Sequence, residues 1–151
     1  MKPKARLRVG KNNIKGNSMN PFIKSGCSLI IDVQLKKFSL GDILVFLAGG
    51  EIVAHRIIGI KSSRKRVGYT LKGDNHPRID RIIYSDEIVG KVEKIIYPEY
   101  SIDLNSRKNQ FLKYFFVLYS RLNLKFPLLL NLRKLYKIPF LKGLYRFLLK
   151  S

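Results

Sequence analysis

The chain has 151 residues and carries 30 Lys and Arg against 10 Asp and Glu, a formal net charge of +20 at pH 7. This length allows one domain with a hydrophobic core, or a compact domain with an appendage. The charge favours a polyanionic partner, either nucleic acid or an anionic membrane surface. A single cysteine, Cys27, excludes an intramolecular disulfide, and two histidines make no Cys/His cluster of zinc spacing. We therefore expect neither a metal nor another cofactor.

The N-terminal residues 1–13 form a basic arm with no apolar run after it, unlike a signal peptide or a membrane anchor. No stretch reaches the roughly 18 apolar residues that a membrane-spanning helix needs. We therefore expect a chain that does not cross a membrane.

Short β-rich runs dominate the next part of the chain. Two of them, residues 42–48 and 51–60, are joined by Gly49 and Gly50, which is a strong hairpin signal. Further strands are predicted at residues 28–33, 67–71 and 88–97, with a polar loop over residues 72–81. The pattern predicts a small, mainly β domain over residues 14–98.

The composition changes in residues 99–151. The last acidic residue is Asp103, so residues 105–151 hold eleven Lys and Arg and no Asp or Glu. Aromatic and leucine residues alternate there with basic ones in helical register, and Pro127 and Pro139 suit the first turn of a helix. Lys142, Arg146 and Lys150 fall on one face. This tail is predicted to be an amphipathic α-helical appendage.

Ser18 is an isolated small nucleophile between Gly16 and Pro21, just ahead of a predicted strand. A serine is an ordinary alcohol unless a base lies beside it. His55 is the best candidate, because it lies in the apolar strand 51–60 and needs a polar partner there. The alternative is a core histidine whose nitrogens bind backbone groups. His76 ranks below His55, because it lies in the polar loop.

The same loop carries two carboxylates, Asp74 and Asp80. A serine–histidine pair needs a group that holds the imidazole in the right tautomer, and a carboxylate is the usual one. Either aspartate could instead stabilise a turn through its own hydrogen bonds.

Five blocks of sequence carry a resemblance: residues 16–21 around Ser18, 41–46, 53–57 around His55, 72–75 together with Asp80, and 89–92. In order and spacing they resemble the signal peptidase I family, in the branch with a histidine base that is found in archaea, the endoplasmic reticulum and some spore-forming bacteria. The resemblance covers residues 14–97. It implies a β fold shared with LexA-type self-cleaving proteases, and an endopeptidase that cuts secretory or leader segments after small residues.

By this resemblance Ser18 is the nucleophile, His55 the general base, and Asp80 or Asp74 the orienting carboxylate. Met19, Pro21 and Asn17 are expected to contact the substrate. Gly16 offers no hydroxyl to the oxyanion, so backbone N–H groups or Asn17 would have to compensate.

Members of that family usually have a membrane-spanning helix before the serine, and here a short basic arm takes its place. We expect residues 105–151 to bind an anionic membrane surface as an interfacial segment, which makes the protein peripheral or monotopic, on a side left open. The tail could instead pack on the β domain, dock on a membrane protein or, less in keeping with its leucines, bind nucleic acid.

Two other functions remain as alternatives to a signal-peptidase-like enzyme. One is a non-catalytic membrane- or nucleic-acid-binding module on the same β scaffold. The other is a self-cleaving repressor-like protein. It fits less well, because that group uses lysine as its base and no helix-turn-helix fits before Gly16.

Overall fold

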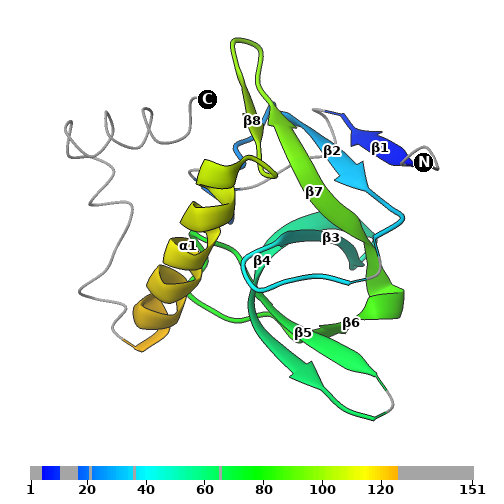
Figure 1. Ribbon diagram of the computed structural model, residues 1–151, viewed down its shortest axis with the longest axis vertical. Helices are drawn as coiled ribbons and strands as arrows, with labels where there is room; N and C mark the ends of the chain where they lie inside the picture. The colour runs from blue at the N-terminus through cyan, green and yellow to red at the C-terminus, as the bar shows by residue number, and fades with distance from the viewer. Residues whose placement is uncertain (1–4, 11–16, 21, 36, 65, 126–151) are drawn as a thin grey trace.

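The computed structural model describes residues 5–10, 17–20, 22–35, 37–64 and 66–125. The fold is mainly β, a curled antiparallel sheet followed by one helix, which confirms the predicted fold class. In Figure 1 the strands curl around the middle of the molecule and the helix α1 runs along one side of them.

Within the residues that the structure describes, eight strands form the sheet, in the order β1-β2-β7-β3-β4-β5-β6, and β8 pairs with β7. All the pairings are antiparallel. The central pair β3–β4 is the predicted hairpin, and Gly49 and Gly50 both have positive φ at its turn, as a type I′ turn requires. The elements are β1 (Arg6–Val9), β2 (Ser28–Asp32), β3 (Ile43–Ala48), β4 (Glu51–Ser62), β5 (Val67–Lys72), β6 (Ile82–Tyr84), a 3-10 turn (Ser85–Glu87), β7 (Ile88–Ile96), β8 (Ser101–Asp103) and α1 (Arg107–Lys125).

Three of these strands were not predicted from the sequence. β1 lies within the basic arm, and pairing with β2 orders it although three of its four side chains are exposed. β6 and β8 have three residues each, too few for an alternating pattern to stand out.

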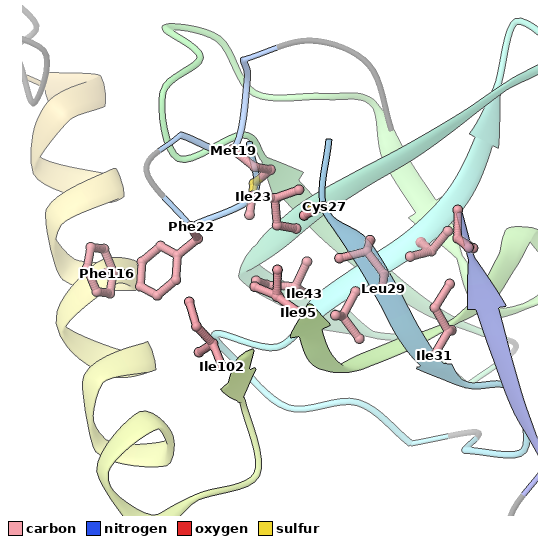
Figure 2. Close-up of a cluster of buried hydrophobic side chains, with 13 residues drawn as sticks. Met19, Phe22, Ile23, Cys27, Leu29, Ile31, Ile43, Ile95, Ile102 and Phe116 are labelled. Carbon is pink, nitrogen blue, oxygen red and sulfur yellow. The ribbon is translucent and has the colours of Figure 1, made fainter. Parts of the chain in front are cut away.

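The two faces of β4 pack on different hydrophobic clusters. On one face Val53 and Ile57 lie against Leu44 and Tyr69. Ile52 and Ala54, on the other face, pack against the larger cluster. Figure 2 shows part of that larger cluster, with Phe116 of α1 pointing toward Phe22 at one end. The period-2 pattern therefore fixes His55 on the face of Val53 and Ile57.

The helix α1 packs on the β domain. Ser106 precedes its first turn, and the Ser106 hydroxyl accepts a hydrogen bond from the Asn109 backbone N–H at 3.4 Å. The rings of Phe22 and Phe116 meet edge to face at 4.4 Å, and Arg121 Nε donates to the Ile58 carbonyl at 2.9 Å. One face of α1 therefore packs on the β domain, which is one of the alternatives that the sequence left open for the tail.

No helix within residues 5–125, leaving out the undescribed positions, is long and apolar enough to span a membrane. The part of the predicted appendage that contains Pro127, Pro139, Lys142, Arg146 and Lys150 lies outside the described residues.

Candidate active site

Ser18 and His55 lie within hydrogen-bonding distance, although 37 residues separate them in the chain. Ser18 is half-buried in the loop before β2, and His55 is in the middle of β4, where 7% of its surface is exposed. The Ser18 Oγ and His55 Nε2 atoms are 2.9 Å apart. The Phe46 ring packs edge to face on the imidazole, with 6.1 Å between ring centroids. The imidazole is thus held in place by its strand and by this ring.

The other ring nitrogen of His55 contacts Asp80. The distance from His55 Nδ1 to Asp80 Oδ2 is 2.5 Å, and the Asp80 side chain is 23% exposed. In the tautomer with its proton on Nδ1, the ring donates to the Asp80 carboxylate, and Nε2 accepts from the Ser18 hydroxyl. Serine, histidine and aspartate therefore form one hydrogen-bonded chain with the tautomer that a general base requires.

Asp74 binds a different partner. Its two carboxylate oxygens accept hydrogen bonds from Arg56 Nε and Nη2 at 2.8 and 2.7 Å, and both side chains are buried. Arg56 also donates to the Gly41 carbonyl at 3.0 Å. Of the two candidates for orienting His55, the structure places Asp80 at the ring and Asp74 in a buried ion pair beside it.

The loop after β5 holds the serine loop directly. The Asn75 backbone N–H donates to the Ser18 carbonyl at 2.7 Å, and the Asp74 backbone N–H donates to Met19 Sδ at 3.4 Å. The Asn75 side chain donates to the Asn17 carbonyl at 3.0 Å. These three bonds fix the backbone on both sides of the serine relative to the loop that carries the orienting aspartate.

A family model described as peptidase S24-like matches residues 9–93, more than half of the chain, and this range includes Ser18, His55 and Asp80. The chain belongs to the peptidase S24-like family. No curated protein and no solved structure matches the chain. Membership of the S24-like family indicates a serine peptidase within the superfamily that joins LexA-type proteins and signal peptidases.

The structure places the remaining predicted residues of this S24-like domain as follows. Met19 is 3% exposed and belongs to the core beneath the serine, so its side chain supports the loop rather than presenting a surface to substrate. Asn17 is exposed beside the serine, and its side-chain oxygen accepts from Asn20 Nδ2 at 3.1 Å. Pro21 and Gly16 lie outside the described residues.

The second histidine is not part of the hydrogen-bonded chain. His76 is exposed, and its Nδ1 lies 3.3 Å from the Arg78 carbonyl, two residues further along the loop. This exposed position in the loop of the S24-like domain agrees with the prediction that His55 is the better candidate for the base.

Lys72 is a feature of the site that the sequence did not single out. It ends β5, is 0% exposed, and donates from Nζ to the Gly73 carbonyl at 3.1 Å. Burial lowers the pKa of Lys72, and the nearby carboxylates of Asp74 and Asp80 act in the opposite direction. The sequence pattern placed Lys72 in the polar loop, whereas in the structure it is the last residue of β5 and pairs with Arg56 of β4.

Among the residues that the structure describes, no group of three or more His, Cys, Asp or Glu side chains is arranged to hold a metal ion.

Proposed function

We propose that this protein is a serine endopeptidase that cleaves signal or leader peptides after small residues. The observation that carries the proposal is the hydrogen-bonded chain from Ser18 through His55 to Asp80, with 2.9 Å between Ser18 Oγ and His55 Nε2. A non-catalytic module would not need a base at that distance from a half-buried hydroxyl, so the geometry supports the peptidase over that alternative.

The proposed reaction is an acyl transfer through the serine. His55 Nε2 takes the Ser18 proton as Oγ attacks the scissile carbonyl, and it returns that proton to the leaving amine as the peptide C–N bond breaks. A water molecule then attacks the acyl-enzyme in the same way, which frees the new carboxylate and restores the hydroxyl. Asp80 stays ionised and stabilises the imidazolium that forms in each half of the reaction.

The oxyanion needs hydrogen-bond donors near Ser18. Backbone N–H groups of the serine loop are one source, and the exposed Asn17 amide is our candidate for a side-chain donor. Loss of a single oxyanion donor costs about 10²- to 10³-fold in kcat in a well-studied serine protease. Asn17→Ala is therefore expected to lower kcat far more than KM if the amide has this role.

The substrate class rests on the five sequence blocks that resemble signal peptidase I. In the structure these blocks supply the serine loop, the two strands of the β3–β4 hairpin, the loop with Asp74 and Asp80, and part of β7. They are neighbours in space as well as in order, because β7, β3, β4 and β5 are adjacent in the sheet. This arrangement supports assigning the substrate class of that family to the whole site.

The test is cleavage of a reporter peptide that carries a leader segment with a small residue before the cut. We expect Ser18→Ala and His55→Ala to abolish cleavage. Ser63→Ala and His76→Ala are matched controls, since both replace exposed side chains of the same types outside the hydrogen-bonded chain. Full activity in the Ser18 and His55 variants would refute the proposal. Fragments of the chain itself beside an intact reporter would instead favour self-cleavage.

A further inference from the structure

The outward side of α1 exposes a stripe of large apolar side chains. Phe111 is 79% exposed, Phe115 59% and Leu118 57%, and the stripe also contains Tyr114 and Leu122. A few hundred Å² of contiguous apolar surface is the usual limit on a monomer, and larger patches mark interaction sites. We call these five side chains the α1 stripe.

The spacing of the α1 stripe is that of one helix face. Its members follow Phe111 by three, four, seven and eleven residues, which covers an arc of about 100° on a helix. The opposite face holds α1 on the β domain through Phe116 and Lys113, and Arg121, at the edge of the stripe, donates to the Ile58 carbonyl. Because that inner face is fixed, the stripe cannot turn inward without undocking the helix. Figure 1 shows α1 lying along one side of the strands, with its other side directed away from them.

The charged residues of α1 itself are all basic. Arg107 and Lys108 lie in the first turn, Lys125 ends the helix, and α1 has no Asp or Glu. Aromatic and leucine side chains between basic ones are what a helix presents when it lies in the plane of a membrane interface. Each basic residue near an anionic lipid surface strengthens binding about fivefold.

We propose that the α1 stripe is a lipid-binding surface, which seats the helix in the interface of an anionic membrane with the β domain held on its other side. A second copy of the chain fits this face less well, because two such helices would bring like charges together without a carboxylate on either. Single-stranded nucleic acid also fits less well, because Leu118 and Leu122 offer no ring on which a base could stack. The proposal does not rest on the peptidase activity.

The chain has no tryptophan, so a single introduced one reports on its own surroundings. We would place it in the stripe of the full chain as Phe115→Trp, and at an exposed apolar position of β4 as Ile60→Trp for the control. With phosphatidylcholine vesicles that contain phosphatidylserine, Phe115→Trp should shift its emission to the blue and be quenched by brominated lipid. Ile60→Trp should do neither. Vesicles of phosphatidylcholine alone should give a smaller effect.

A second pair of variants measures the affinity for vesicles. Phe111→Ser combined with Phe115→Ser should weaken co-sedimentation with the anionic vesicles at least tenfold, whereas Ile60→Ser should leave it unchanged. Cleavage of a short soluble reporter should be the same in all of them, so a failure of this proposal is separable from a failure of the proposed function.

Three results would overturn the proposal. The emission of Phe115→Trp could already be blue-shifted without vesicles and stay the same when vesicles are added. This result would show that another part of the chain or a second copy covers the stripe. Dependence of that emission on protein concentration would identify the second copy. A response to a single-stranded oligonucleotide, with none to vesicles, would assign the surface to nucleic acid.

Discussion

Gly73→Ala is expected to slow reporter cleavage while leaving the protein folded. A β-carbon at Gly73 would lie 2.7 Å from the Ser18 carbonyl oxygen, 3.0 Å from Ser18 Cβ and 3.0 Å from His55 Nε2. Ordinary contacts of this kind begin at 3.4 Å. One methyl group would therefore press on the nucleophile and the base at the same time, and Gly73 has no positive φ that would strain an alanine backbone.

The magnitude follows from the size of the clash. Ser18 and His55 would have to move by about half an ångström, and a misplacement of 1 Å costs about 10²-fold in rate. We therefore expect kcat/KM for reporter cleavage to fall roughly 10- to 100-fold. Overpacking of this kind costs about 1–3 kcal/mol of stability. Steady-state cleavage and denaturant unfolding of the same preparation measure the two effects separately.

Gly68→Ala is the matched control for crowding. Its β-carbon would lie 2.7 Å from Ile82 Cγ2, away from the serine and the histidine. The control should lose stability in a similar way but cleave the reporter at the wild-type rate. Unchanged kcat/KM in Gly73→Ala, or an equal loss in both variants, would refute the account of how this glycine serves the site.

Three further predictions follow from the same region. Asp80→Asn keeps the size of the side chain but no longer fixes the His55 tautomer, so kcat should fall by up to about 10⁴-fold, whereas Asp86→Asn, in the turn after β6, should leave reporter cleavage unchanged. Arg56→Met leaves Asp74 buried without its partner and should cost about 3–5 kcal/mol in denaturant unfolding. Arg81→Met removes an exposed ion pair with Glu87 and should not measurably change stability; equal losses in the two would contradict the burial argument. Burial lowers the pKa of Lys72, so its amino group binds a proton more tightly in the unfolded chain than in the folded one. Protonated Lys72 therefore destabilises the fold at pH values below its ordinary pKa of 10.5. Lys72→Met should therefore be more stable than wild type at neutral pH, with an advantage that shrinks as the pH rises toward that value, and a gap independent of pH would contradict this.

The sequence predicted those features of the fold and the site that depend on residues close together in the chain. The Gly49–Gly50 turn and the alternation along β4 are short-range signals, and the hairpin and the facing of His55 follow from them. The mainly β class and a helix after the sheet, Arg107–Lys125, were confirmed as well.

The choice between the two aspartates could not be made from the sequence. It depends on the path of the loop, in which the Asp80 backbone N–H returns to the Leu71 carbonyl at 3.0 Å and brings Asp80 to the histidine. Arg56 points to the face of β4 opposite His55, where its guanidinium lies over the rings of Phe22 and Phe116, 4.8 and 5.3 Å from their centroids. There it forms the ion pair with Asp74. Such pairings are decided by tertiary packing.

Ser18 and His55 are expected to act as one catalytic unit, and a double-mutant cycle measures how strongly their contributions to cleavage are coupled. Reporter cleavage is measured for Ser18→Ala, His55→Ala and the double variant under conditions where uncatalysed hydrolysis is known. If the histidine acts only by activating the serine, the double variant should be no slower than either single one. Losses that multiply in the double variant would show that the two side chains act independently and that His55 is not the base that activates Ser18.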